Sequence, residues 1–337
     1  MIANNDLVHL RFTKGVQCFV AASVLYLLPF LTSGFAQTLP VSGSINGVHD
    51  PVIAEENGRY YLFSTDPGIS IRCSSDLLEW QLCSAVFFGL PDWIKEEVPA
   101  VGELWAPDIS FYNGKYQLYY SASTFGDNTS AIGLATNVTL DPNHPDYAWQ
   151  DQGLVIRSGE NDNWNALDPS FVLDTEGQAW LTFGSFWSGI KLVKLDPETR
   201  KSVENAELYP LANRPGSTAV EAPYIHHHNG FYYLFVSFDQ CCEGIDSTYN
   251  IRVGRSESIT GPYLDKEGVA MLEGGGTLLK EGGERYKGPG HNVVFQHNGQ
   301  DYLVYHAYDA EDFGTSKLRI ERLQWQDGWP ILSRLQD

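Results

Sequence analysis

Short apolar strands, each introduced by a tight turn, recur five times along the chain. In each copy a turn dipeptide is followed by an aromatic-rich strand, and the dipeptide is Asn-Gly in four copies and Glu-Gly in the fifth. Asn-Gly accepts the positive φ angles of a tight hairpin at little steric cost. The pattern therefore predicts five β-hairpins, whose turns begin at Asn57, Asn113, Glu176, Asn229 and Asn298.

A proline precedes each of these turns and marks the start of an apolar strand. Proline lacks an N–H group, so it is well placed at the first residue of a strand. The five residues are Pro51, Pro107, Pro169, Pro223 and Pro289, spaced 56, 62, 54 and 66 residues apart. Each interval has room for about four short strands. Further strands are expected at 68–73, 130–136, 189–195, 251–256 and 317–325.

Five units of four strands predict an all-β fold, a five-bladed β-propeller that forms a single catalytic domain. A β-sandwich rarely needs about 290 residues, and a β-helix has a far shorter repeat. Sustained helical periodicity is absent from the sequence after the first 36 residues, although 92–98 could form one helical turn.

The first 36 residues have the layout of a targeting segment. Arg11 and Lys14 precede an apolar run over 16–31, and 34–36 then offer small residues for cleavage before Gln37. This is typical of a cleaved signal peptide. The alternative, a membrane anchor, is disfavoured because the run is shorter than the roughly 20 residues that span a bilayer. We expect a secreted, extracellular protein whose catalytic domain covers 37–337.

Four cysteines remain after that segment, which suits an oxidising compartment. Three pairings are possible in principle. Cys73 and Cys83 could join adjacent strands, and Cys241 and Cys242 could form a vicinal bridge.

The amino-acid composition indicates which kinds of binding partner are disfavoured. Lys and Arg number 22 against 42 Asp and Glu, for a net charge of −20. A nucleic-acid-binding protein is expected to carry a basic face, so this class is disfavoured, as is adhesion to anionic membranes. Aromatic residues make up 13% of the chain, which suits surfaces on which sugars stack.

The starts of the five innermost strands carry candidate catalytic groups. In a propeller the first strand of each blade lines the central channel, so these five positions converge at one opening. They carry three carboxylates, Asp50, Asp168 and Glu221, together with Trp105 and His291. We expect the three carboxylates at one structural step, although Glu221 lies two residues before its proline and the aspartates lie one before. Singly, an Asp-Pro pair is a common turn opener, so the indication rests on the convergence.

Glycoside hydrolysis requires such carboxylates. One must be protonated to give a proton to the leaving oxygen, and another must be ionised to activate water or to attack the sugar. A third carboxylate nearby can raise the pKa of the acid, because adjacent negative charge disfavours ionisation.

With these residues in view, the chain resembles glycoside hydrolase family 43, and within it the endo-1,5-α-L-arabinanases, from about residue 45 to 325. The matching segments are 49–51, 104–109, 167–171, 220–224, 237–242 and 288–292. The resemblance implies hydrolysis, with inversion, of internal α-1,5-L-arabinofuranosidic bonds in arabinan, a side chain of pectin. Arabinan would be the binding partner, and we expect the protein to be a monomer.

The resemblance also implies roles for single residues. Asp50 would be the general base and Glu221 the general acid, about 6.5–9.5 Å apart in an inverting enzyme, while Asp168 would raise the pKa of Glu221 and orient it. Further residues matched to substrate contacts are Trp105 and Phe125 as stacking platforms and Asn165 and Ser185 near the central sugar.

His291 matches a histidine that binds a metal ion, described as calcium, below the active site. Calcium prefers six to eight oxygen ligands, so water would supply most of them. The alternative is a buried histidine hydrogen-bonded to the carboxylates. The run 226–228 of three histidines is better explained by a strand end and loop than by a metal site.

Two other functions stay open on the sequence. Within the family, the chain could be an exo-acting arabinanase, an α-L-arabinofuranosidase or a β-xylosidase, because loops set the shape of the groove. Outside it, a sugar-binding propeller without catalysis would keep the aromatic platforms but need not retain three carboxylates.

Overall fold

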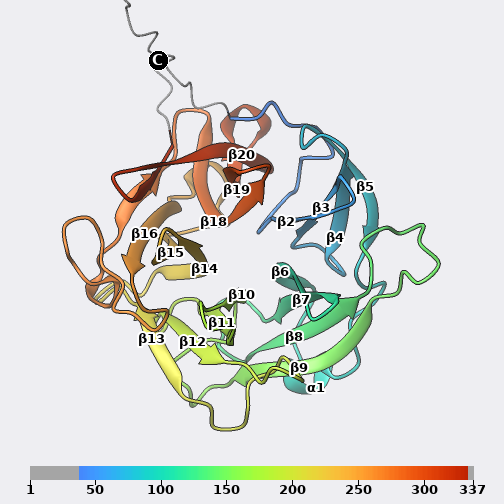
Figure 1. The fold of residues 1–337 in the computed structure, drawn as a ribbon, viewed down its shortest axis with the longest axis horizontal. Coiled ribbons are helices and arrows are strands. Elements are labelled where there is room, and N and C mark those ends of the chain that lie inside the picture. The colour runs from blue at the N-terminus through green and yellow to red at the C-terminus, as the bar shows by residue number, and fades with distance from the viewer. Residues whose placement is uncertain (1–37, 333–337) are drawn as a thin grey trace, which may run out of the picture. The chain divides into compact units, whose positions relative to one another are not determined.

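The computed structural model describes residues 38–332. The expected targeting segment at 1–36 lies outside the described residues. Within them, the strands form five sheets arranged as a ring of blades (Figure 1). The prediction of a five-bladed β-propeller is confirmed.

The strands of the blades have the following bounds. Blade 1 holds β1 (Ser42–Gly43), β2 (Val52–Glu56), β3 (Arg59–Ser64), β4 (Ser70–Ser74) and β5 (Glu79–Ala85). Blade 2 holds β6 (Leu104–Tyr112), β7 (Lys115–Ala122), β8 (Ser130–Asn137) and β9 (Gln150–Ser158). Blade 3 holds β10 (Ser170–Leu173), β11 (Ala179–Phe183), β12 (Ile190–Lys194) and β13 (Leu208–Ala212). Blade 4 holds β14 (Val220–His228), β15 (Phe231–Phe238), β16 (Asn250–Ser256) and β17 (Thr277–Lys280), and blade 5 holds β18 (Tyr286–His297), β19 (Gln300–Asp309), β20 (Thr315–Gln326) and β21 (Trp329–Ile331).

Each blade begins at the centre of the ring and is built outwards. The strands β2, β6, β10, β14 and β18 are innermost, and each pairs antiparallel with the strand that follows it (Figure 1). The expected hairpin turns connect these pairs, with Asn57, Asn113, Asn229 and Asn298 at positive φ. In four of the five blades, the turn chemistry read from the sequence therefore locates the turn between the first and second strands.

Helices are short in the described part of the chain. The expected helical turn is α1 (Ile94–Glu97), and the 3₁₀ turns are η1 (Gly244–Asp246), η2 (Met271–Glu273) and η3 (Ala310–Asp312). None of the helices within residues 38–332 has the length and apolar character needed to cross a membrane.

The segment 38–47 closes the ring. It pairs in parallel with the outer strand of blade 1, where Ser42 lies opposite Glu79. It also bonds to blade 5: the Leu39 N–H donates to the Ile320 carbonyl at 2.8 Å, and the Gly47 N–H donates to the Ser316 carbonyl at 2.8 Å. One short stretch of chain therefore joins the first blade to the last.

Apolar side chains fill the spaces between blades. One buried cluster joins Leu181 of blade 3 to Ile132 of blade 2, and another joins Tyr233 of blade 4 to Leu303 of blade 5. Burial of apolar area is the main favourable term in folding. The blades are thus held together chiefly by face-to-face apolar packing. The polar residues at the starts of the inner strands are not needed for this packing.

Both cysteine pairs considered from the sequence are disulfides. Cys73 of β4 is bonded to Cys83 of β5, and Cys241 is bonded to its neighbour Cys242. The first bond lies across two strands of blade 1, whereas the second lies beyond the end of β15, at the centre of the ring.

Candidate active site

A cavity of about 1320 Å³ opens at the centre of the ring. It is lined by side chains from all five blades. All eight residues that the sequence singled out line it, namely Asp50, Trp105, Phe125, Asn165, Asp168, Ser185, Glu221 and His291. The structure therefore brings together every predicted site residue, while their individual chemical roles remain predictions.

The backbone at each blade start is unusual. The residue before each of the five prolines has a positive φ: 50° at Asp50, 48° at Ala106, 58° at Asp168, 54° at Ala222 and 51° at Gly288. Positive φ is uncommon outside glycine, and such backbone gathers at functional sites where the surrounding structure enforces it. The repeated proline thus marks a repeated, constrained turn that faces the cavity.

The expectation that all three carboxylates share one structural step is wrong for Glu221. Asp50 and Asp168 occupy the residue before proline, whereas in blade 4 that residue is Ala222. The pairing of β14 with β15 shifts register between Glu221 and Tyr224, and an irregularity of this kind redirects side chains. Glu221 therefore reaches the cavity from one residue upstream.

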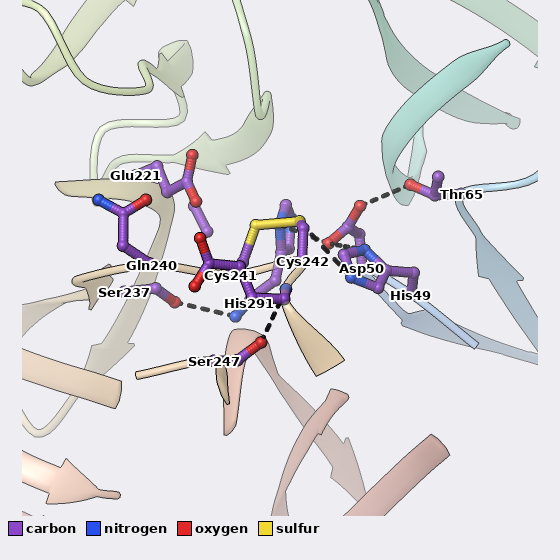
Figure 2. Close-up of a disulfide and its surroundings, with 12 residues drawn as sticks. His49, Asp50, Thr65, Glu221, Ser237, Gln240, Cys241, Cys242, Ser247 and His291 are labelled. Atoms are coloured by element: carbon purple, nitrogen blue, oxygen red, sulfur yellow. Dashed lines mark hydrogen bonds and ion pairs between the residues drawn. A yellow bond between two sulfur atoms is a disulfide. The ribbon is translucent and has the colours of Figure 1, made fainter. Parts of the chain in front are cut away.

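Asp50 lies among hydrogen-bond donors. Its Oδ2 accepts from Oγ1 of Thr65 at 2.6 Å, and its Oδ1 lies 3.1 Å from Nδ1 of His49 and 3.1 Å from Nδ1 of His291 (Figure 2). Burial on its own would raise the pKa of Asp50, but the two imidazoles outweigh burial and hold that pKa well below its ordinary value. Asp50 is therefore ionised at neutral pH, as a general base requires.

Glu221 has the opposite tendency. Its Oε2 accepts a hydrogen bond from Oγ of Ser185 at 2.6 Å. Burial raises the pKa of Glu221 and the charge of Asp50 adds to the rise, while hydrogen bonds from Ser185 and Tyr249 and the nearby His291 oppose it. The net pKa is raised, so Glu221 retains a proton at a higher pH than an ordinary glutamate does.

Asp168 connects these groups. Burial raises the pKa of Asp168 to about 8, and the charges of Glu221 and Asp50 add to burial while His291 opposes it. Its Oδ2 accepts from the backbone N–H of Ala222 at 3.0 Å. Because Ala222 directly follows Glu221, this bond fixes the backbone that carries Glu221.

His291 is an ion-pair partner of Asp50. Burial would lower the pKa of His291, but Asp50 raises it to about 9. Its backbone N–H donates to Oγ of Ser237 at 2.9 Å, which fixes the backbone of β18 at the cavity. The alternative considered from the sequence, a histidine hydrogen-bonded to the carboxylates, therefore describes the Nδ1 atom of His291.

The expected metal ion can be tested against the same residue. His291 lies beside the carboxyl groups of Asp50, Asp168 and Glu221, and its Nδ1 pairs with Asp50, so Nε2 is the atom that could contact a metal ion. This arrangement fits one imidazole ligand with water as the remaining shell. It does not provide the protein oxygen ligands that calcium usually takes.

Four blade starts are fixed by a side chain from the preceding blade, and sequence reasoning missed these partners. The Asp50 N–H donates to Nδ1 of His306 at 3.2 Å, the Ala106 N–H to Oγ1 of Thr65 at 2.8 Å, the Asp168 N–H to Oγ of Ser121 at 3.0 Å, and the His291 N–H to Oγ of Ser237 at 2.9 Å. Each partner lies on or just after the second strand of its blade. That strand runs antiparallel to the first and returns to the same opening, which is the signal that could have identified them.

Aromatic residues form one wall of the cavity. The rings of Trp105 and Phe125 have centroids 5.0 Å apart and are tilted by 49°, and Phe125 is 78% exposed. Nε1 of Trp105 donates to Glu103 at 3.1 Å, which fixes the indole. A large exposed aromatic face in a cavity that also holds carboxyl groups is a surface on which sugar rings stack.

The same cavity contains a buried amide side chain, that of Asn165. Asn165 is buried, and its Oδ1 has no hydrogen-bond partner among the residues that the structure describes. Buried polar atoms are nearly always satisfied. Since Asn165 lines the cavity, a sugar hydroxyl is a suitable donor for this oxygen.

The fold and the site together define a class of protein. A cavity that combines an ionised carboxylate, a protonated carboxyl group and aromatic walls is the arrangement by which glycoside hydrolases cleave their substrates.

Comparisons with known proteins give the family. The model of glycosyl hydrolases family 43 matches residues 42–330. An extracellular endo-α-(1→5)-L-arabinanase of Bacillus subtilis is 46% identical over 318 residues, covering 93% of this chain and 96% of its own length. An extracellular exo-α-(1→5)-L-arabinofuranosidase of Cellvibrio japonicus is 47% identical over 296 residues, covering 84% and 85%. The chain belongs to glycoside hydrolase family 43.

A solved structure agrees with this assignment. The α-L-arabinanase of Cellvibrio cellulosa complexed with arabinohexaose has a TM-score of 0.83 and 46% identity, covering 86% of this chain and 96% of that one. The family resemblance inferred from the sequence is therefore confirmed.

Proposed function

We propose that this family 43 glycoside hydrolase cleaves internal α-1,5-L-arabinofuranosidic bonds of arabinan with inversion at the anomeric carbon. One observation carries the proposal. A single cavity holds Asp50, whose pKa is lowered, together with Glu221, whose pKa is raised. Two carboxyl groups driven to opposite ionisation are the acid and base that glycoside hydrolysis needs.

The chemistry divides between these groups. Asp50 takes a proton from water as the water oxygen attacks the anomeric carbon. Glu221 gives its proton to the glycosidic oxygen, so that the bond to the leaving sugar breaks as the new bond forms. Asp168 contacts the backbone at Ala222 and thereby positions Glu221. Trp105 and Phe125 hold sugar units by stacking, and Oδ1 of Asn165 accepts a hydrogen bond from a sugar hydroxyl.

Endo action is supported by the size of the cavity and by the Bacillus subtilis relative. A volume of about 1320 Å³ exceeds the roughly 300–1,000 Å³ of pockets that hold drug-sized ligands, so several sugar units can bind at once. Exo action is the second candidate, because the Cellvibrio japonicus relative is named for it.

Secretion is part of the proposal. The layout of residues 1–36 is typical of a signal peptide, and relatives of the chain are named extracellular. We further propose that the protein acts as a monomer. A calcium ion, if bound, would be held by Nε2 of His291 with water ligands, and it would add positive charge beside the carboxylates.

Incubation with linear, debranched arabinan, followed by chromatography of early products, tests the proposal. We expect a ladder of arabino-oligosaccharides. A single short product from the first time points would support exo action instead, and binding without cleavage would contradict hydrolysis of arabinan altogether.

A further inference from the structure

The vicinal disulfide lies inside the active-site cavity. Cys241 and Cys242 both line the cavity that holds the carboxylates, and Cys242 is exposed to it. Sγ of Cys242 lies 4.0 Å from Nε2 of His49, the neighbour of Asp50 (Figure 2). The residues of the other disulfide, Cys73 and Cys83, do not line this cavity.

A chain of hydrogen bonds leads from the disulfide to Asp50. The backbone N–H of Cys242 donates to the hydroxyl of Tyr308 at 2.8 Å, and that hydroxyl lies 2.7 Å from Nε2 of His49. Nδ1 of the same imidazole lies 3.1 Å from Oδ1 of Asp50. The chain crosses from the end of β15 in blade 4 through β19 in blade 5 to the start of blade 1.

The Cys242 amide sets the direction of this chain. An amide N–H can only donate, so the oxygen of Tyr308 accepts and its own hydrogen is available for Nε2 of His49. When Nε2 of a neutral imidazole accepts, the proton lies on Nδ1. His49 then donates from Nδ1 to Asp50, in the orientation that keeps the carboxylate ionised.

The disulfide fixes the amide that starts the chain. Cys242 has a φ of 69°, a conformation uncommon for a residue with a side chain. The bond between the two sulfur atoms closes a small ring around the peptide that joins Cys241 to Cys242, which restricts both residues. Without that ring, the segment from Gln240 to Glu243, which lies at the surface of the cavity, has much greater freedom.

We propose that the Cys241–Cys242 disulfide is a positioning element of the active site, which orients the carboxylate of Asp50 through Tyr308 and His49. The proposal rests on the function of Asp50 as general base. It assigns an effect on the chemical step, not on affinity, because the chain ends at Asp50 and not at a sugar.

Steady-state kinetics on a linear arabino-oligosaccharide test this role. In the double variant Cys241→Ser, Cys242→Ser, we expect kcat to fall at least about tenfold, because small misplacements of a reacting group are costly, with KM within about threefold of the wild-type value. Tyr308→Phe keeps the disulfide but breaks the chain, so we expect the same loss in kcat. The matched control, Cys73→Ser with Cys83→Ser, should keep kcat.

The outcomes separate this proposal from the proposed function. An unchanged kcat in both Tyr308→Phe and the Cys241, Cys242 variant, with Asp50→Asn inactive, would overturn the positioning role and leave the function intact. A rise in KM alone would also overturn it. An active Asp50→Asn variant would remove the general base itself.

A second site lies away from the cavity and rests on different observations. His226 and His228 stand two residues apart on β14, so their side chains share a face of the strand. Candidate ligand atoms of these two histidines and of Asp301 on β19 all lie within 4.8 Å of one another. Nε2 of His226 is buried and has no hydrogen-bond partner among the described residues, and it lies 3.8 Å from Oδ2 of Asp301.

The surroundings favour a metal ion over a hydrogen bond at this cluster. A separation of 3.8 Å between Nε2 of His226 and Oδ2 of Asp301 is too long for a hydrogen bond but suits two ligands of one ion. Nε1 of Trp325 donates to Oδ2 of Asp301 at 2.7 Å, the kind of outer contact that orients metal-binding carboxylates.

We infer that His226, His228 and Asp301 form a site for a divalent transition-metal ion of the zinc type, which prefers imidazole and carboxylate ligands. The ion would join the inner strand of blade 4 to β19 of blade 5. This departs from the sequence-based interpretation of the histidine run, because Asp301 is distant in sequence.

Zinc binding to single-histidine variants tests this site. After treatment with a chelator and equilibrium dialysis against micromolar Zn²⁺, the metal content per chain is measured. We expect His228→Ala to bind about one zinc ion fewer than the wild type. His227→Ala is the matched control: its ring packs on Tyr232, 5.0 Å between centroids, and it should bind as much as the wild type. Equal zinc content in the wild type and His228→Ala would overturn the site.

Discussion

The carboxylate of Asp168 accepts a hydrogen bond from the backbone N–H of Ala222, the residue that directly follows Glu221. Asp168 therefore acts on Glu221 by two routes. One is the positioning of its backbone, and the other is electrostatic, because Asp168 and Glu221 are both buried and each tends to keep a proton. Substitutions at residue 168 can separate the two routes.

Asp168→Asn keeps an oxygen that can accept from the Ala222 N–H and replaces a carboxyl group whose pKa is raised to about 8. Below that pH Asp168 is largely protonated and carries little charge. We therefore expect Asp168→Asn to leave the alkaline limb of the kcat/KM profile near its wild-type position. Asp168→Ala also removes the acceptor for Ala222 and should lower kcat, by about 10²–10⁴-fold in line with acid–base contributions. An alkaline limb that moves to lower pH in Asp168→Asn would show that a charged Asp168 raises the pKa of Glu221.

The wild-type pH profile should be bell-shaped and broad. Activity needs Asp50 ionised, and since the pKa of Asp50 lies well below its ordinary value, the acid limb should lie at unusually low pH. Activity also needs Glu221 protonated, and since its pKa is raised, the alkaline limb should lie above the ordinary pKa of a glutamate. Initial rates at low substrate concentration across the pH range measure both limbs. A profile that has already levelled off below the ordinary pKa of a glutamate, and that falls only well above that pKa, fits this assignment; a fall that begins near the ordinary glutamate pKa does not.

Thr65 should matter to the rate although it is not charged. Its hydroxyl donates to Asp50 at 2.6 Å and accepts from the Ala106 N–H at 2.8 Å. Thr65→Val preserves the shape of the side chain and removes both bonds. Since hydrogen bonds to charged groups contribute about 1.5–3 kcal/mol, we expect kcat to fall about tenfold or more, and Thr65→Ser to restore most of the loss. Equal kcat in Val and wild-type enzymes would show that Asp50 is held by its histidines alone.

Trp105 should act on affinity. Its ring forms the cavity wall with Phe125, and loss of an aromatic contact of about 1–1.5 kcal/mol corresponds to a KM roughly five- to tenfold higher. We expect Trp105→Ala to raise KM on arabino-oligosaccharides more than it lowers kcat. Trp180, which packs against Tyr209 in blade 3 and does not line the cavity, offers a comparison, because Trp180→Phe should leave KM unchanged.

The Cys73–Cys83 disulfide should contribute to stability. It closes a loop with a sequence separation of 10, for which the chain-entropy model gives about 2–3 kcal/mol. We expect the Ser, Ser variant to unfold at lower denaturant concentration than the wild type, with kcat preserved. An unchanged denaturant midpoint of unfolding would show that this disulfide does not contribute to stability.

Much of the fold could be predicted because its signals are local. The turn dipeptides at Asn57, Asn113, Asn229 and Asn298 and the prolines that precede them depend on neighbouring residues, and these locate every inner strand. The ring closure could not be predicted, since Ser42 pairs with Glu79 in blade 1 and Leu39 bonds to Ile320 in blade 5. Nothing in the sequence of the segment 38–47 specifies partners at those distances.

The site divides in the same way. Asp50, Asp168 and Glu221 were found because the repeated proline aligns the blades. The groups that hold Asp50 and its neighbour His49 in place were missed. His306 accepts from the backbone of Asp50 and Tyr308 contacts the imidazole of His49, and both lie more than 250 residues away in sequence. The offset of Glu221 from the proline was visible in the sequence, but the register shift of β14 at Glu221 was not.

Separating the acid from the base tests the central claim most directly. The measurement is the hydrolysis of linear arabinan and of an aryl arabino-oligosaccharide with a good leaving group, by Glu221→Gln and Asp50→Asn variants that remain folded. A good leaving group needs no proton, so Glu221→Gln should lose activity on arabinan yet keep most of its rate on the aryl substrate, while Asp50→Asn should lose both. Loss of activity on both substrates in Glu221→Gln, or full arabinan hydrolysis by either variant, would contradict the roles assigned to these two residues.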